Sequence, residues 1–284
     1  MRLRLGEHEI DCTHHTAVMA ILNISDDSPV AHSRVGVAGA LDRARALAGE
    51  GAEIIDVGAN STLTGSRDLG VQEEIDRVAP VVEAIVGAGL PVSVDTWKAP
   101  VARAAAEAGA HILNDVSGFT DDAMVAVAAE FGLPGIVMHM RGKPKHHREV
   151  SQRYDDVGAD VRAFLVARAA DLRARGVEAW LDPGFEFGKT LDDNVRLYED
   201  LPKLVATGQP VLISASRKYF LAELIGGERS QQVEGLTEAT MTFNALAGLA
   251  GVHVVRVHDV HACAIALRLV DSLRRMRAEH ATGG

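Results

Sequence analysis

Short runs of consecutive apolar residues alternate with longer stretches of mixed composition along almost the whole chain. The apolar runs cover residues 17–23, 52–58, 91–95, 111–115, 135–140, 179–184, 210–214 and 253–258. They are rich in β-branched residues and stay apolar at successive positions, which is typical of strands buried on both faces of a parallel sheet. The pattern therefore predicts eight buried parallel strands.

The stretches between these runs are rich in Ala, Arg and Glu and repeat their apolar residues at helical spacing. They predict helices at 37–50, 72–88, 98–108, 121–131, 155–175, 191–206, 231–250 and 260–278. Glycines that suit helix C-caps precede most of the strands, at Gly51, Gly89, Gly109, Gly132, Gly176, Gly208 and Gly251.

Eight strand–helix units predict an α/β fold of the (β/α)8 (TIM) barrel type, formed as a single domain by residues 1–284. A doubly wound open sheet shares the same alternation and is the alternative. The number of strands favours the barrel, and no G-x-G-x-x-G sequence follows the first strand.

Composition and charge exclude several classes of partner. The chain has 284 residues, a formal net charge of −10 and 4% aromatic residues, which makes binding to nucleic acid or to a membrane surface a poor fit. No apolar run reaches the roughly 20 residues of a membrane span, and the N-terminal sequence lacks the apolar segment of a signal peptide. We therefore expect a cytoplasmic protein. Cys12 and Cys263 make neither a disulfide framework nor a zinc motif, so we interpret both as buried thiols.

Polar residues gather at one end of the predicted strands. The carboxyl ends carry Asn23, Asp56, Asp95, Asn114 with Asp115, His139, Asp182, Ser216 with Lys218, and Arg256 with His258. The amino ends begin in most cases with small or apolar residues. Because barrel enzymes build their active sites at the carboxyl ends of the strands, this asymmetry predicts where the site lies.

Part of this polar set suits a flat heterocycle. The carboxylates and the amide of Asp95, Asn114 and Asp182 match a ring edge that presents N–H donors and a carbonyl. Asn23 offers an oxygen ligand to Mg²⁺, which relies on water and substrate phosphates for the rest of its coordination.

The other part of the set suits an anion. Four positively charged or titratable side chains follow the seventh and eighth strands, namely Arg217, Lys218, Arg256 and His258. The loops after these two strands commonly bind phosphate in barrel enzymes. A guanidinium beside an imidazole is well suited to a pyrophosphate or a similar anion.

Several polar residues also have a purely structural interpretation. Asp56 fits a buried acid that is hydrogen-bonded inside the barrel, His139 fits a core histidine, and Asp115 fits the cap of the turn after its strand. The basic segment 143–148, with Lys143, Lys145, His146, His147 and Arg148, is interpreted as a solvated loop.

Eight segments, in order along the chain, resemble the dihydropteroate synthases of the pterin-binding enzyme family. They are AILN (20–23), GAEIIDVGANST (51–62), SVDTW (93–97), ILNDVSG (112–118), VMHMRGKP (137–144), LDPGFEFGKT (181–190), SRKYFL (216–221) and RVHDV (256–260). The resemblance covers residues 17–260, and such a colinear series is highly specific for the family.

The resemblance implies an enzyme that joins p-aminobenzoate to a dihydropterin-methyl pyrophosphate and releases pyrophosphate, with Mg²⁺ as its cofactor. By matching motif positions, it assigns catalysis to Asp95, Asp182 and Lys218. It assigns pterin binding to Asp95, Asn114, Asp182 and Lys218. It assigns pyrophosphate binding to Arg256 and His258, with Val257 between them as a further substrate-binding position. Asn23 would be the metal ligand, and Thr62 would lie near both substrates.

Some positions depart from the residues that are usual in the family. Pro29 stands where the first loop has Phe, Leu63 and Thr64 stand where the second loop has Arg and Pro, and Tyr219 stands where a Ser follows Ser-Arg-Lys. In the family, these residues serve the p-aminobenzoate pocket or its closure. Glu186 replaces a Gly in the segment after Asp-Pro-Gly.

These departures leave alternatives to an ordinary synthase open. One is a pterin-binding paralogue with a different second substrate or without synthase activity. A second is a methyltetrahydrofolate-binding methyltransferase, which the Ser-Arg-Lys and Arg-Val-His segments disfavour. A third is a non-enzymatic pterin-binding subunit of a heteromeric assembly. The family resemblance also implies a homodimer, for which the helix near 236–250 is a plausible contact.

Overall fold

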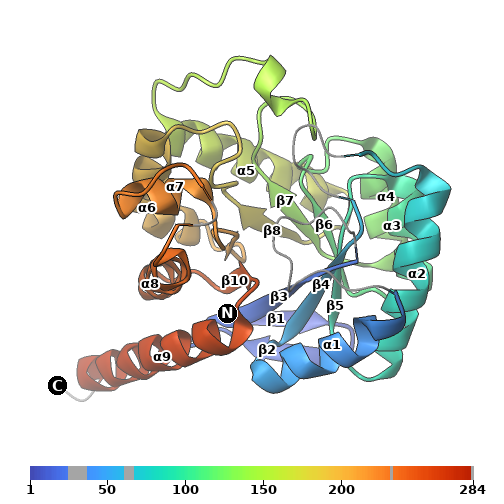
Figure 1. Cartoon of the computed structure of the whole chain (residues 1–284), viewed down its shortest axis with the longest axis horizontal. Coiled ribbons are helices and arrows are strands. Elements are labelled where there is room, and N and C mark those ends of the chain that lie inside the picture. Colours follow the sequence, from blue (N-terminus) through green and yellow to red (C-terminus); the bar gives the residue numbers. More distant parts are fainter. Residues whose placement is uncertain (25–36, 61–66, 231–232, 283–284) are drawn as a thin grey trace.

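Eight parallel strands form the centre of the fold and enclose a barrel (Figure 1). The computed structural model describes residues 1–24, 37–60, 67–230 and 233–282. The barrel strands are β3 (Ala17–Asn23), β4 (Ile54–Gly58), β5 (Val92–Asp95), β6 (Ile112–Asp115), β7 (Gly135–Met138), β8 (Ala179–Asp182), β9 (Leu212–Ile213) and β10 (Val254–Val257). Their order is β8-β7-β6-β5-β4-β3-β10-β9, and a parallel bridge between Leu181 and Val211 joins the two edges. The predicted barrel is confirmed.

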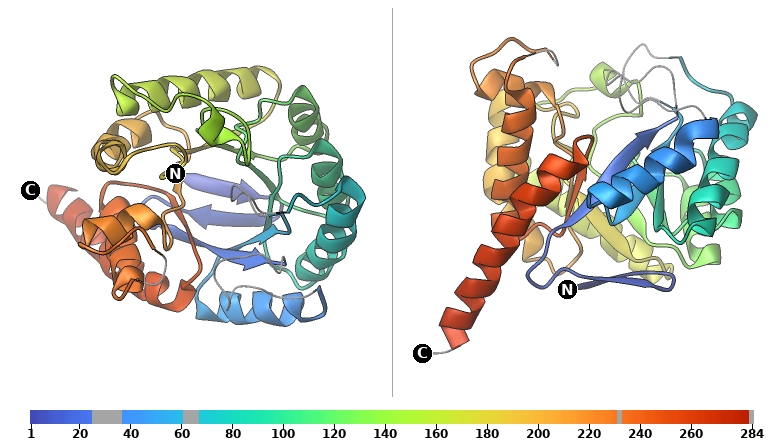
Figure 2. Two further views of the ribbon diagram at one scale, coloured as in Figure 1. Left: turned by 45° about the horizontal axis from the view of Figure 1, so that its top comes forward. Right: turned by 60° about the horizontal axis from the view of Figure 1, so that its bottom comes forward.

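The predicted helices surround the strands as one outer layer (Figure 2). They are α1 (Val37–Glu50), α2 (Val71–Gly87), α3 (Ala99–Glu107), α4 (Asp122–Phe131), α5 (Val157–Ala174), α6 (Leu191–Val205), α8 (Leu236–Leu249) and α9 (Val260–Thr282). All seven predicted C-cap glycines have a positive φ, from 64° at Gly132 to 114° at Gly51. The absence of a Cβ lets each of them turn the chain from a helix toward the next strand.

A β-hairpin at the amino terminus lies outside the elements that the sequence predicts. It consists of β1 (Arg2–Leu5) and β2 (His8–Asp11), paired antiparallel. Arg and Leu alternate in β1, so that Leu3 and Leu5 share one face, and both are fully buried. They pack in one apolar cluster with Trp180 and Met19 at the amino ends of the barrel strands. The hairpin therefore covers the end of the barrel opposite the predicted site (Figure 2).

Three further differences fall on the site side of the barrel. The predicted helix over 231–250 begins at Leu236, and residues 231–232 lie outside the described part of the chain. A separate short helix, α7 (Tyr219–Leu224), follows the loop after β9. A 3-10 turn, η2 (His147–Glu149), interrupts the loop between β7 and α5.

The barrel interior contains an apolar layer next to the hairpin and a polar layer beyond it. Strand residues two apart point to the same face, so a strand can contribute to both layers. Four strands do so, with Ile54 and Asp56, Ile112 and Asn114, Trp180 and Asp182, and Val254 and Arg256. The apolar layer fills the lower barrel, and the polar layer forms the base of the candidate site.

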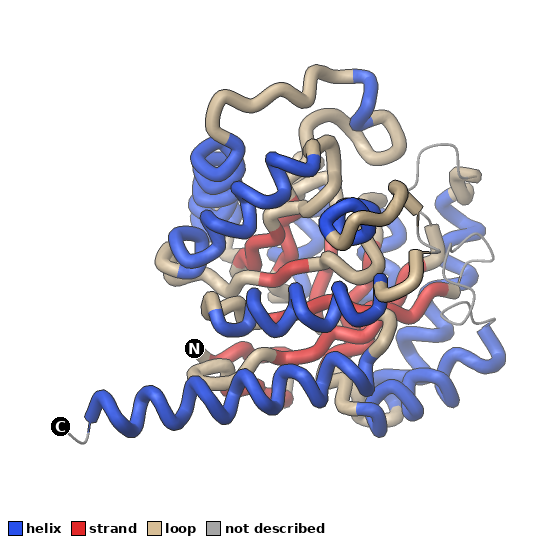
Figure 3. Tube along the Cα trace, turned by 60° about the vertical axis from the view of Figure 1, so that its left-hand side comes forward, coloured by secondary structure: helices blue, strands red, loops and turns tan. Residues whose placement is uncertain are grey.

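The described helices bear on the expectation that the chain has no membrane span. None of the described helices combines the length and apolar character needed to cross a bilayer. The longest, α9, extends past the rest of the molecule at its carboxyl end (Figure 3).

Cys12 and Cys263 are both buried, and burial raises the pKa of each thiol to about 12. The interpretation of both as buried thiols is confirmed.

An ionic cluster at the hairpin end ties α9 to the barrel. His15 Nδ1 lies 2.6 Å from Asp271 Oδ2 of α9, and His15 Nε2 lies 2.7 Å from Glu53 Oε2 in the chain before β4. Asp271 also accepts a hydrogen bond from the backbone N–H of Thr16. Hydrogen bonds to Asp271 and Glu53 raise the pKa of His15 to about 10. His15 is therefore a protonated link between two carboxylates of separate elements.

We expect His15→Gln to lower the free energy of unfolding by about 1–2 kcal/mol near neutral pH, a range reduced for solvent screening because the His15 side chain is 35% exposed. The raised pKa means that the folded chain holds this proton more tightly than the unfolded chain. The stabilisation is complete below the ordinary pKa of 6.5 and is lost as the pH rises through about 10.

Urea unfolding of both proteins at about pH 6 and about pH 10.5 checks this prediction, with His14→Gln as the matched control for loss of a neighbouring histidine. An equal difference in stability at the two pH values would show that the ionic link is not what His15 contributes.

Candidate active site

An arginine and two aspartates lie at the base of the site, inside the barrel. Arg256 of β10 donates from Nε to Asp56 Oδ2 of β4 at 2.6 Å and from a terminal nitrogen to Asp95 Oδ2 of β5 at 2.8 Å. Asp56 is fully buried, and the side chains of Arg256 and Asp95 are each 15% exposed. Buried charges are tolerated only when they are paired. The guanidinium therefore holds both carboxylates in place at the carboxyl ends of three strands.

Asp95 and Asn114 extend this cluster to the neighbouring strand. Asn114 Nδ2 lies 3.4 Å from each carboxylate oxygen of Asp56. Burial raises the pKa of Asp95 above its ordinary value, although the Arg256 guanidinium opposes the change. Among the described residues, Asp95 Oδ1 is buried and has no hydrogen-bond partner. A buried acceptor of this kind is suited to a donor from a ligand.

Across the barrel, Asp182 and Lys218 form the second charged part of the site. Asp182, the last residue of β8, accepts a hydrogen bond from Gly184 N at 2.8 Å. Burial raises the pKa of Asp182 to about 6, while the Gly184 N–H and Lys218 oppose the rise. Lys218 Nζ donates to Phe185 O at 3.1 Å and lies 4.1 Å from the centre of the Phe187 ring.

Lys189 is a buried cation behind Asp182. Its ammonium lies 2.8 Å from Gly184 O, 3.2 Å from Phe187 O and 3.2 Å from His139 Nδ1. Burial lowers the pKa of Lys189 to about 7, and the Asp182 carboxylate opposes this change. Burial, reinforced by the Lys189 charge, lowers the pKa of His139 to about 3. His139 is therefore neutral, and Lys189 connects the ends of β7 and β8.

The loops after β9 and β10 are fastened to each other. Ser216 Oγ lies 3.0 Å from His258 Nδ1 and accepts a hydrogen bond from the His258 backbone N–H. Arg217 makes a bidentate pair with Asp259, at 2.9 and 2.7 Å. These contacts orient the His258 imidazole, and they pair the Arg217 guanidinium that the sequence predicts as part of an anion site.

The side chains at the ends of β3 and β5 fit a magnesium ion. Asn23, Gly58 and Asp95 are in register on three adjacent strands. Asn23 Oδ1 and Asp95 Oδ2 each lie 3.8 Å from the point that a Cβ on Gly58 would occupy, so a side chain there would fill the space between them. Amide and carboxylate oxygens are ligands that Mg²⁺ prefers. In the described part of the chain, no group of three or more His, Cys, Asp and Glu is placed to hold a metal, so water and substrate oxygens would complete the coordination.

Comparison with known proteins assigns the chain to a family. A family model described as pterin binding enzyme matches residues 19–258. The chain is 41% identical over 262 residues to the dihydropteroate synthase of Mycobacterium leprae, covering 90% of this chain and 92% of the relative. The chain belongs to the pterin-binding enzymes.

Solved structures of this family have the same fold. The dihydropteroate synthase of Thermus thermophilus in complex with 4-aminobenzoate superposes with a TM-score of 0.86 at 39% identity, covering 96% of this chain and 100% of that one. The enzyme of Xanthomonas albilineans in complex with 7,8-dihydropteroate has a TM-score of 0.81 at 34% identity, covering 96% and 98%. The folate synthesis bifunctional protein of Arabidopsis thaliana is 37% identical over 97% of this chain, which spans only 52% of that longer relative.

The structure of this pterin-binding enzyme brings most of the predicted site residues to one end of the barrel. Asp95, Asn114, Asp182 and Arg256 belong to the polar layer, and Lys218 and His258 follow the ends of β9 and β10. The side chain of Val257 is different, because it is fully buried in the apolar cluster between the strands and the helices. The whole residue is buried, and its role as a substrate-binding position stays a prediction.

Other predicted positions lie outside the described residues. These are Thr62 and the loop departures Pro29, Leu63 and Thr64.

The structural interpretations of individual polar residues are confirmed in three cases and partly wrong in a fourth. Asp56 is a buried, hydrogen-bonded acid and His139 is a buried core histidine, as expected. Asp115 caps its turn by accepting hydrogen bonds from the N–H groups of Ser117 and Phe119.

The basic segment at 143–148 is not a uniformly solvated loop. His147 is buried, and the Lys145 ammonium donates to Asn60 Oδ1 at 3.1 Å and to Arg67 O at 2.8 Å. The sequence did not reveal these partners because they lie on the loop between β4 and α2, about 80 residues away in the chain.

Two residues that contribute to the site were not predicted from the sequence. Lys189 connects the ends of β7 and β8, and Glu186 contacts the start of α7. Both lie in the segment LDPGFEFGKT, in which a charged residue between buried neighbours was the available signal. Ser216 was predicted among the polar residues at the strand ends, but its contact with His258, 42 residues away, was not.

We expect Arg256→Met to destabilise the fold by about 3–5 kcal/mol, because Asp56 and Asp95 would be left buried without their shared cation. Denaturant unfolding measures the change. Arg217→Met is the matched control, since it removes an arginine from a partly exposed pair with Asp259, and we expect it to cost about 1 kcal/mol. Equal losses in the two variants would contradict a special dependence of the fold on the Arg256 cluster.

Proposed function

We propose that this chain is a dihydropteroate synthase, which joins a dihydropterin-methyl pyrophosphate to p-aminobenzoate and releases pyrophosphate in folate biosynthesis. The identity to dihydropteroate synthases extends over the barrel and over the strand ends that carry the site. The relatives' structures contain 4-aminobenzoate in one case and 7,8-dihydropteroate in another. Both compounds belong to this reaction, as second substrate and product.

The single observation that carries the proposal is the polar layer of the barrel. Asp95, Asn114 and Asp182 present carboxylate and amide groups at one end of the barrel interior. A pterin presents an amino group, ring N–H groups and a carbonyl, which these side chains match by charge-assisted hydrogen bonds. The unpaired Asp95 Oδ1 provides an acceptor for one of the ring donors. A pterin bound there would place its methylene group toward the open end of the barrel.

The reaction is a substitution at that methylene carbon. The amine nitrogen donates its electron pair to form a C–N bond, the C–O bond to pyrophosphate breaks, and its electron pair leaves with pyrophosphate. The nitrogen then releases a proton to water. Positive charge that develops on the pterin is stabilised by the fixed carboxylates of Asp95 and Asp182. Hydrogen-bond donors to the departing anion come from Lys218, Arg256 and His258. Two hydrogen bonds to carboxylates fix the plane of the Arg256 guanidinium.

Mg²⁺ fits this proposal as a cofactor. Asn23 and Asp95 would hold it, beside the open space at Gly58. The ion would neutralise negative charge on the pyrophosphate. In the chain itself, Asp95 Oδ2 also accepts a hydrogen bond from Arg256, so Mg²⁺ would share this oxygen with the guanidinium.

A homodimer is part of the proposal. Two adjacent helices of the outer layer, α8 and α9, expose large apolar side chains at Leu246, Leu249, Ile265, Leu269, Leu273 and Met276. The four residues on α9 repeat at helical spacing and therefore share a face. Monomeric proteins rarely leave such a stripe in water. A second copy of the chain would bury it. The cytoplasmic location expected from the sequence stays a prediction.

The test of the activity mixes the purified protein with dihydropterin-methyl pyrophosphate, Mg²⁺ and p-aminobenzoate and measures both products. We expect pyrophosphate and dihydropteroate in equal amounts. Asp182→Asn should weaken binding of the pterin substrate at least about tenfold, because it removes the charge from a buried acceptor. Lys203→Ala on the exposed side of α6 is the control and should bind normally. A folded protein that releases pyrophosphate only with some other nucleophile would support the paralogue with a changed second substrate.

We expect Leu269→Glu to convert a dimer to a monomer in sedimentation velocity, because a charge would be buried at the centre of the α9 stripe. Val166→Glu, at a similarly exposed apolar position on α5, is the control and should leave the dimer intact. A wild-type monomer, or a dimer unaffected by the Leu269 substitution, would refute this interface.

A further inference from the structure

Glu186 has an unusual backbone conformation beside the proposed pterin site. Its φ is +70°, in the left-handed region that residues with a Cβ rarely adopt. The conformation is held in place because the Glu186 backbone N–H donates to Asn194 Oδ1 at 2.7 Å, and Asn194 is buried in α6. Disfavoured backbone conformations that are held in this way cluster at functional sites.

The Glu186 carboxylate joins two loops on the rim of the barrel. Its Oε2 accepts a hydrogen bond from the backbone N–H of Tyr219 at 2.8 Å, and its Oε1 accepts one from Arg229 at 3.0 Å. The side chain is 12% exposed. Glu186 thus fills a small anion position made by the N–H of Tyr219 and the guanidinium of Arg229.

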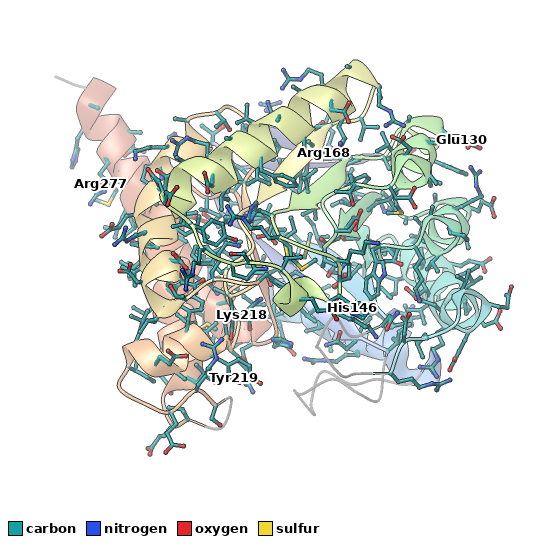
Figure 4. The ribbon with its side chains drawn as sticks, turned by 90° about the horizontal axis from the view of Figure 1, so that it is seen from above. Glu130, His146, Arg168, Lys218, Tyr219 and Arg277 are labelled. Carbon is teal, nitrogen blue, oxygen red and sulfur yellow. The ribbon has the colours of Figure 1, made fainter. Side chains whose placement is uncertain are left out.

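This anion position adjoins Lys218, whose side chain lies next to that of Tyr219 at the start of α7 (Figure 4). Burial lowers the pKa of Lys218, and Glu186 is the foremost of the negative groups that oppose this change. The carboxylate therefore acts on a cation of the proposed site. Any second anion at this position would meet the charge of Glu186 directly.

Two other arginines at this end of the barrel also have carboxylate partners. Arg217 is paired with Asp259, and Arg256 is paired with Asp56 and Asp95. If the carboxylate of an aromatic amine approached Arg229 or the Tyr219 N–H, it would have to displace or share the Glu186 carboxylate. An uncharged amine would not.

We propose that Glu186 is a specificity-determining residue, which occupies a carboxylate position at the start of α7 and so disfavours amines that carry a carboxylate. The inference rests on the proposed function, because it concerns the second substrate of that reaction. Glu186 lowers the preference for p-aminobenzoate relative to an uncharged aromatic amine of the same shape. It acts through charge repulsion and through competition for the Tyr219 N–H and Arg229.

The test compares p-aminobenzoate with uncharged 4-aminobenzamide as substrates for the wild-type protein and for Glu186→Gln. The substitution keeps the length of the side chain and an oxygen for the Tyr219 N–H, but it removes the charge. We expect the ratio of kcat/KM for the carboxylate to that for the amide to rise about tenfold, through a lower KM for p-aminobenzoate. An unchanged or smaller ratio would overturn the proposal.

Two further variants separate this effect from a general change in the loops. Glu223→Gln removes the other carboxylate that pairs with Arg229, and we expect it to leave the ratio unchanged. A tenfold rise there as well would show that loss of any negative charge beside Arg229 raises the ratio, and it would overturn the specific role of Glu186. Glu186→Gly suits the positive φ and should raise the ratio as the glutamine variant does, which provides a second test if that variant folds poorly.

A binding measurement distinguishes failure of this inference from failure of the proposed function. If neither amine is converted by any of the proteins, the proposed synthase activity is refuted. Calorimetric titration with p-aminobenzoate then tests Glu186 directly, and we expect about tenfold tighter binding to Glu186→Gln than to the wild type. Equal affinities, or no binding to either protein, would overturn the role of Glu186.

Discussion

The contact of Arg256 with Asp56 and Asp95 is the interaction on which the rest of the site depends. These three side chains come from β10, β4 and β5, and they meet inside the barrel, where an unpaired charge is costly. Removing Arg256 would leave both carboxylates buried without their shared cation. Asp95 in turn borders the Gly58 space and carries the unpaired oxygen Oδ1. The proposed metal position and one edge of the proposed pterin position are thus built on a single guanidinium.

The strand geometry explains how such a charged cluster coexists with a stable barrel. Four of the contributing strands have an apolar interior residue two positions before the polar one, as in Ile54 before Asp56 and Trp180 before Asp182. The amino-terminal hairpin adds Leu3 and Leu5 to the apolar layer. Packing at one end of the barrel therefore provides the stability that the charged end does not, and the strands hold the part of the site made by Asp95, Asn114, Asp182 and Arg256.

Much of the fold and part of the site could be predicted from the sequence. Strand β3 and helix α1 have the predicted bounds, because continuous apolar runs and helical spacing are local signals. The hairpin has only four residues in each strand, and its burial depends on contacts with the apolar layer of the barrel. The alternation of Arg and Leu in β1 therefore does not by itself indicate that Leu3 and Leu5 are buried against the barrel.

Side-chain pairing in the site was beyond prediction for a related reason. Arg256 lies 200 residues from Asp56, and Lys145 lies 85 residues from Asn60. The residue types and their places at the strand ends indicated a charged site. The pairing of each cation with a particular carboxylate depends on the register of neighbouring strands and on the paths of the loops. The prediction of Arg217 as an anion ligand did not include its pairing with Asp259 for this reason.

The pairing of internal charges has different consequences for the two kinds of ligand. A pterin brings hydrogen-bond donors to Asp95 Oδ1 and Asp182, which requires no internal ion pair to open. An anion that approaches the site arginines meets cations that already have carboxylate partners, such as Arg229 with Glu186. Its binding gains only the difference in free energy between its own contact with the cation and the internal ion pair that it replaces. Three arginines at this end of the barrel, Arg217, Arg229 and Arg256, are shared in this way with acids of the chain. Selectivity among anionic ligands therefore depends on which internal carboxylate a ligand displaces from its cation.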